Sequence, residues 1–186
     1  MGPPKWRVSR RIVLRFSIPK PSFAPPKEAV SYNVGMELGK VREFLVEARA
    51  KTYAAAGGKV KPVLAGSTQL EYQDGDFLYR DIYYVGNGVF PGLETVYFDN
   101  KPVWSMSYFG NFKQITEEEA DKVLRAALLD NWETTRLNKH VEWTKNNYKY
   151  VCEGSGDMKE LEGSESITKD GKQVYFFYYA GGFLEE

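Results

Sequence analysis

The feature that most constrains the fold is a strict alternation of side chains over residues 76–84. One set of alternating positions holds Phe77, Tyr79, Asp81 and Tyr83, and the other holds Leu78, Arg80, Ile82 and Tyr84. A period of two is the geometry of a β-strand with two distinct faces. The Asp74-Gly75 pair in front of it is a hairpin turn signal, which predicts pairing with a short strand at 70–73.

Further strands are predicted at 94–98, 102–108, 148–153, 165–168 and 173–179. One helix is predicted over 37–53, and a second begins at Thr116, where Glu119 completes a capping box. Residues 131–146 are predicted to be a polar connection. Most connections between strands are too short for a parallel crossover. The chain is therefore predicted to be an α+β protein with an antiparallel, aromatic-rich sheet of about six to eight strands and two main helices.

Charge divides the chain into two parts. Residues 1–30 are rich in proline, include a possible strand at 11–18, and hold seven lysines and arginines before the first acid, whereas the whole chain has 25 basic and 25 acidic residues. We predict a basic arm at 1–30 and one α+β domain at 31–186. The arm could bind RNA or the ribosome, or pack on the acidic domain. Its candidate nucleic-acid contacts are Lys5, Arg7, Arg10, Arg11 and Arg15.

Composition also bears on location. Cys152 is the one cysteine, so no internal disulfide forms, which suits a reducing compartment. The sequence shows no signal-peptide pattern and no run of 18 apolar residues. These features predict a soluble, cytoplasmic protein without a membrane partner, and they leave the oligomeric state open.

One face of the predicted sheet is the main candidate site. An acid in mid-strand among aromatic rings is costly unless it is paired or solvated, and apolar walls with a few polar groups are typical of small-molecule pockets. The alternative is an ordinary core whose tyrosine hydroxyls reach its edge. The candidate ligand-binding residues are Tyr79, Asp81, Tyr83, Glu94, Trp104, Met106 and Tyr108.

The remaining chemical candidates are weak. His140 is predicted to be a solvated surface residue, and Cys152 a small buried side chain rather than a nucleophile. The glycine-rich loop 86–92 links two strands instead of preceding a helix, so we interpret it as a flexible rim and not as a phosphate loop. No catalytic residue, metal site or cofactor is predicted.

A long part of the chain, about residues 41–182, resembles a bacterial and archaeal family known as domain of unknown function family 5680. The matching pieces are Phe44-Leu45, Thr52-Tyr53-Ala54, Gly66-Ser67, Leu70-Glu71-Tyr72, Gly75-Asp76-Phe77, Tyr79, Asp81-Ile82-Tyr83, Phe90-Pro91-Gly92, Glu94, Val96-Tyr97, the run from Pro102 to Gly110, Gly171, Val174-Tyr175 and Gly181-Gly182. The resemblance implies no activity. Members often look like the C-terminal part of helix-turn-helix regulators, but the proline-rich residues 1–30 do not fit such a motif, so a DNA-binding role is not carried over.

The sequence therefore favours a non-enzymatic binding domain with an aromatic and acidic cleft for a small ligand or a peptide. The first alternative is a nucleic-acid- or ribosome-associated factor that acts through the basic arm. The second is a carboxylate-based enzyme that uses Asp81 and Glu94 as an acid–base pair.

Overall fold

The computed structural model describes residues 34–137 and 139–184, so the predicted basic arm and its strand at 11–18 lie outside the described residues. The first elements are a helix, α1 (Val34–Arg49), and a single wide turn, η1 (Ala50–Ala54). The next five strands are β1 (Lys59–Val60), β2 (Thr68–Asp74), β3 (Phe77–Tyr83), β4 (Val89–Phe98) and β5 (Lys101–Asn111). After them come α2 (Glu117–Asp130), β6 (Val141–Lys145), β7 (Tyr148–Gly156), β8 (Glu160–Lys169) and β9 (Lys172–Phe183).

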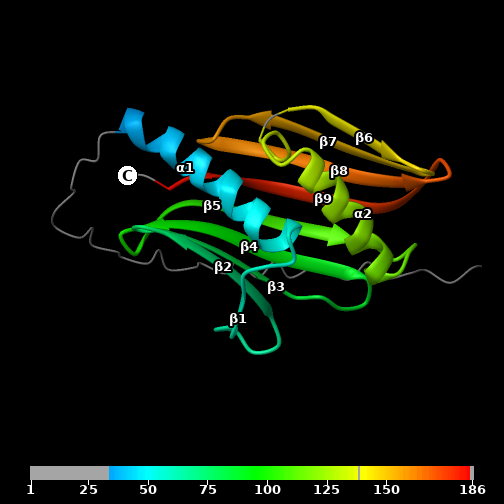
Figure 1. Ribbon diagram of the computed structural model, residues 1–186, viewed down its shortest axis with the longest axis horizontal. Coiled ribbons are helices and arrows are strands. Elements are labelled where there is room, and N and C mark those ends of the chain that lie inside the picture. Colours follow the sequence, from blue (N-terminus) through cyan, green and yellow to red (C-terminus); the bar gives the residue numbers. More distant parts are fainter. Residues whose placement is uncertain (1–33, 138, 185–186) are drawn as a thin grey trace, which may run out of the picture. The chain divides into compact units, whose positions relative to one another are not determined.

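The strands form one antiparallel sheet in the order β1-β2-β3-β4-β5-β9-β8-β7-β6. Two meanders, β1–β5 and β6–β9, meet where β5 pairs with β9 (Figure 1). This confirms the predicted α+β class with an antiparallel sheet. The described residues contain nine strands, however, and not six to eight.

The predicted number of strands is too low because two edge strands have polar sequences. Residues 141–145, placed in a polar connection, form β6, with Trp143 paired to Tyr150 of β7. Residues 59–60, for which no strand is predicted, pair with β2 as β1. An edge strand buries little apolar surface, so its composition does not distinguish it from a loop. The glycine-rich loop is also shorter than the predicted 86–92, because β4 begins at Val89.

Both helices lie on the same face of the sheet (Figure 1). The buried face of α2 is an apolar stripe of Ala120, Val123, Leu124, Ala127 and Leu128. From α1, Phe44 stacks on Phe77 of β3 with ring centroids 5.0 Å apart. Neither helix among the described residues is long and apolar enough to cross a membrane.

The start of α2 is only half of the predicted capping box. The Glu119 backbone N–H donates to Oγ1 of Thr116 at 3.2 Å, as expected for an N-cap. The Glu119 carboxylate does not return to Thr116; it accepts from Lys169 at 2.6 Å and from the Tyr148 hydroxyl. A tertiary ion pair thus replaces the local bond and fastens α2 to β7 and β8.

Two glycines in the sheet decide where aromatic rings lie on its inner face. Gly92 is opposite Tyr108, and Gly110 is opposite Phe90. A Cβ atom at Gly110 would come within 1.9 Å of the Phe90 ring, and one at Gly92 within 2.3 Å of the Tyr108 ring. Because neither glycine has a side chain, each ring lies across the neighbouring strand.

We therefore predict that Gly110→Ala lowers the unfolding free energy by about 1–3 kcal/mol, the usual cost of overpacking. The Phe90 ring must move to make room for the new methyl group. Chemical denaturation measures the loss. Gly86→Ala is the matched control, since a Cβ there meets nothing within 4 Å, and equal losses in the two variants would contradict the packing role of Gly110.

Candidate functional site

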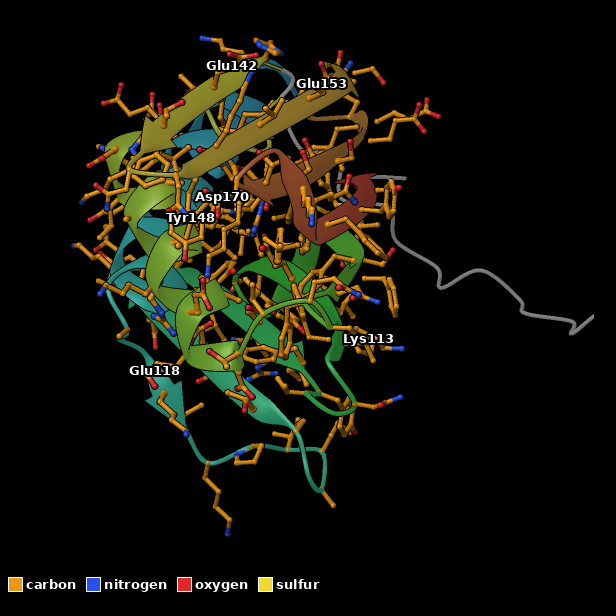
Figure 2. All side chains as sticks on the ribbon, turned by 90° about the vertical axis from the view of Figure 1, so that its right-hand side faces the viewer. Lys113, Glu118, Glu142, Tyr148, Glu153 and Asp170 are labelled. Carbon is orange, nitrogen blue, oxygen red and sulfur yellow. The ribbon has the colours of Figure 1, made fainter. Side chains whose placement is uncertain are left out.

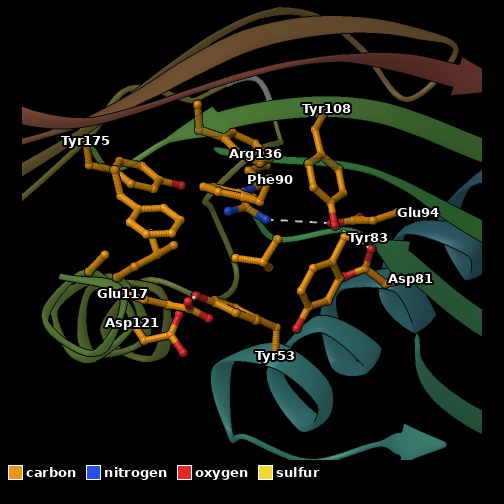
Figure 3. A pocket seen from close by; sticks show the side chains of 15 residues that line it. Tyr53, Asp81, Tyr83, Phe90, Glu94, Tyr108, Glu117, Asp121, Arg136 and Tyr175 are labelled. Atoms are coloured by element: carbon orange, nitrogen blue, oxygen red, sulfur yellow. Dashed lines mark hydrogen bonds and ion pairs between the residues drawn. The ribbon is translucent and has the colours of Figure 1, made fainter. Parts of the chain in front are cut away.

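A pocket of about 70 Å³ opens between α2, η1 and the inner face of the sheet (Figure 3). This volume exceeds the ~15 Å³ that one water requires, but it is well below the ~300 Å³ of a pocket that encloses a drug-sized ligand. It therefore suits a small molecule or the end of a larger one. The aromatic part of its wall includes Tyr53, Tyr83, Phe90, Tyr108, Tyr175 and Phe177.

The structure divides the seven predicted ligand-binding residues into two groups. Asp81, Tyr83, Glu94 and Tyr108 line the pocket. Tyr79, Trp104 and Met106 point to the same side of the sheet but are buried in the core, each at most 1% exposed. Arg49 of α1 covers Trp104, with its guanidinium carbon 5.6 Å from the ring centroid. Tyr79 lines a second, smaller cavity of about 30 Å³ together with Arg49.

Asp81 and Glu94 are direct cross-strand partners on β3 and β4. They are 5% and 2% exposed. The Tyr108 hydroxyl donates to Oδ1 of Asp81 at 2.7 Å. Arg80, which the alternation predicts to lie on the other face, pairs with Glu71 there at 2.7 Å.

Asp81 and Glu94 differ in how closely positively charged side chains approach them. Burial, and next the charge of Glu94, raise the pKa of Asp81 from 3.8 to about 8, and the Tyr108 hydrogen bond and the arginines offset this only in part. Asp81 is therefore mostly protonated at neutral pH. Glu94, in contrast, is paired with Arg49 at 2.7 Å and lies 3.6 Å from Arg136.

Arg136 is the centre of the buried polar network. Its Nε donates to Oε1 of Glu165 at 2.6 Å and its Nη2 to Oε2 at 2.9 Å, a two-bond contact. The Tyr150 hydroxyl also donates to Glu165, at 2.8 Å. Burial lowers the pKa of Arg136, but the charge and hydrogen bonds of Glu165 more than compensate and hold it well above its ordinary value.

The backbone brings Arg136 to this position at a local cost. Its φ is +59°, in the left-handed region that non-glycine residues seldom adopt. Just before it, the Thr135 hydroxyl donates to the carbonyl of Asn131 at 2.6 Å and fixes the turn that follows α2. The surrounding contacts thus hold a strained residue in place at the pocket wall.

Three residues of this network, Arg49, Arg136 and Glu165, are not among the candidates that the sequence predicts. Arg136 lies in the segment taken as a polar connection, where nothing distinguishes it from a solvated arginine. Glu165 did carry a signal, because it alternates with Ile167 and so shares the buried face of β8. An acid at an inward position requires a buried partner.

The weaker candidates have ordinary surroundings. His140 is exposed and lies 3.4 Å from both Glu142 and Glu153, which are neighbours at the surface in Figure 2. Cys152 is fully buried, and burial raises the pKa of its thiol. Within 34–137 and 139–184, no three His, Cys, Asp or Glu side chains are grouped to hold a metal ion.

The protonated state of Asp81 predicts how stability depends on pH. Because the pKa is higher in the folded state, folding binds a proton between about pH 4 and pH 8, so stability falls as pH rises through this window. Asp81→Asn removes that dependence. As pH rises through this window, the unfolding free energy of the variant should increase relative to that of the wild type by up to about 1.4 kcal/mol per pH unit. Urea denaturation from pH 5 to pH 8 measures this, and exposed Asp74→Asn is the control, for which the difference should stay constant.

The buried pair of Arg136 and Glu165 predicts strong coupling. Arg136→Met should cost about 3–5 kcal/mol of unfolding free energy, because it leaves the buried Glu165 carboxylate without its cation. Combining it with Glu165→Gln should cost clearly less than the sum of the two single losses. A double-mutant cycle by urea denaturation measures this. The matched surface cycle on Lys149 and Glu142, 3.0 Å apart, should give at most about 1 kcal/mol.

Comparison with known proteins agrees with the predicted resemblance. A family model, described as "Domain of unknown function (DUF5680)", matches residues 81–184, from the pocket aspartate to the end of β9. The predicted resemblance began earlier, at about residue 41. No curated protein and no solved structure matches the chain. Because the family model covers more than half of the chain, this protein belongs to the domain of unknown function family DUF5680.

Proposed function

We propose that this chain is a non-enzymatic binding domain whose pocket takes a small ligand or the end of a peptide side chain. The observation that carries the proposal is Asp81, a buried and mostly protonated acid at the wall of an open aromatic pocket. Within the described residues, the Tyr108 hydroxyl donates to Oδ1 of Asp81 at 2.7 Å and so fixes the carboxyl group beside the open pocket. A buried acid with a strongly raised pKa at the wall of an open pocket favours a role in binding.

The carboxylate-based enzyme is the second candidate because Asp81 and Glu94 lie side by side in the pocket. A general base or nucleophile needs an oxygen that is free to react. Arg49 holds Oε2 of Glu94, and Arg136 faces Oε1 at 3.6 Å. Both oxygens of one member of the pair thus face cations, and this favours binding over catalysis.

The nucleic-acid alternative depends on residues 5–15, outside the described part of the chain, and it remains a prediction from charge. Deleting residues 1–30 would test it without touching the pocket. Salt-sensitive binding to RNA that disappears with the deletion would support this alternative.

A thermal-shift screen of chemically diverse small molecules tests the binding proposal. A ligand at 100 times its Kd adds about 2.7 kcal/mol, which corresponds to a Tm increase of about 5–10 °C for a chain of this size. Asp81→Ala should abolish the shift, while exposed Asp74→Ala should keep it. If the folded wild type shows no shift with any compound, the proposal fails.

A further inference from the structure

The charges around the pocket are unequally matched. Its lining includes four carboxyl groups and one guanidinium: Asp81 and Glu94 on the sheet, Glu117 and Asp121 on α2, and Arg136 (Figure 3). The Arg136 guanidinium is already bound through two hydrogen bonds to Glu165, which lies behind the pocket. The pocket lining therefore contains more acidic than basic side chains.

The two acids on α2 differ in their partners. Asp121 pairs with Arg125 at 3.2 Å and accepts a hydrogen bond from the Tyr53 hydroxyl at 2.6 Å. Glu117 is exposed and has no ion pair with any residue that the structure describes. Its carboxylate thus remains available to a cation that approaches the pocket.

The aromatic walls already bind cations of the chain itself. The guanidinium carbon of Arg136 lies 4.2 Å from the centre of the Phe177 ring, and that of Arg125 lies 4.2 Å from the centre of the Tyr53 ring. An aromatic ring attracts a cation over its face through its quadrupole. The same wall can receive a further cation from solution.

Asp81 supplies a hydrogen-bond acceptor inside these walls. Its Oδ2, which is not the oxygen that the Tyr108 hydroxyl reaches, can accept an N–H bond once the carboxyl proton is lost, and a cation held beside it favours that loss. A quaternary ammonium lacks the N–H group for this bond. A pocket of about 70 Å³ also has room for a head group but not for a large ligand.

We propose, building on the binding function above, that the pocket takes the N–H-bearing head group of a small organic cation, an alkylammonium or a guanidinium. The bound cation pairs with the Asp81 carboxylate, and the carboxyl proton is released to solvent. One cation enters and one proton leaves, so the charge of the pocket is conserved.

The groups that face Asp81 are compatible with this exchange. They are Tyr79 and Tyr83 on β3, Glu94 on β4, Tyr108 on β5, Arg49 on α1 and Arg136 after α2. Glu117 and Asp121 of α2 line the same pocket. Burial raises the pKa of each of these tyrosines, that of Tyr83 to about 12, so they stay neutral up to pH 9. Arg136 stays charged over the same range, because Glu165 holds its pKa well above the ordinary value.

Calorimetry of the full chain with four probes of similar size tests the proposal: butylammonium, guanidinium, butanol and butyrate. We expect only the two cations to bind, with an affinity that rises roughly tenfold per pH unit from pH 6 and levels off above about pH 8. Titrations in buffers of different ionisation enthalpy should show close to one proton released per cation below pH 7.

Variants assign the effect to individual carboxyl groups. Asp81→Asn should remove the pH dependence and weaken cation binding at pH 9 by roughly tenfold to a hundredfold. Glu117→Gln should weaken it less and reduce its salt dependence. Glu118→Gln is the matched control, because Glu118 is adjacent on α2 and does not line the pocket (Figure 2). Circular dichroism at each pH verifies that the variants are folded.

The possible outcomes distinguish the failure of the cation inference from the failure of the proposed binding function. If butanol or butyrate binds as tightly as the cations and Asp81→Asn weakens that binding, the cation inference is wrong and the binding function stands. If the cations bind Asp81→Asn with unchanged affinity and pH dependence, the inference is also wrong. Failure of all four probes overturns the inference, and the broader thermal-shift screen then decides whether the pocket binds anything.

Discussion

Arg136 holds a guanidinium in the interior of the domain, between glutamates that belong to different meanders of the sheet. Glu94 lies on β4, in the first meander, and Glu165 lies on β8, in the second. The turn after α2 carries Arg136 to this point, so one side chain links the helix layer to both halves of the sheet. Without it Glu94 would keep Arg49 as a partner, but the Glu165 carboxylate would be buried without its cation, which costs far more than the loss of an exposed ion pair.

Much of the fold could be predicted because its local patterns are strong. The alternation around Asp81, the apolar stripe of α2 and the Thr116 cap each agree with the structure. The edge strands could not be predicted, because β1 and β6 bury too little apolar surface to show a period. The order of the strands is equally hidden, since the pairing of β5 with β9 joins segments far apart in the chain.

The site was predictable only in part, for a related reason. The alternation of side chains along the strands predicts that seven residues share one face of the sheet, and they do. Alternation does not show which part of that face a helix covers. Arg49 of α1 covers Trp104 and Met106, while Asp81 and Tyr108 line the pocket beside α2. The arginines that set the charge of the site come from a helix and a turn, elements that sheet periodicity does not describe.

The seam between β5 and β9 also has a consequence for how the chain folds. Each meander consists of neighbouring strands joined by short turns, so each can begin to form from local contacts. The seam instead requires closure of a long loop that contains α2 and three strands, which is the slow kind of step in sheet formation. The wall of the pocket combines Tyr108 from one side of this seam with Phe177 from the other, and their ring centroids are 5.1 Å apart. The pocket is thus completed only when the two halves join, and a folding intermediate with one formed meander would lack it.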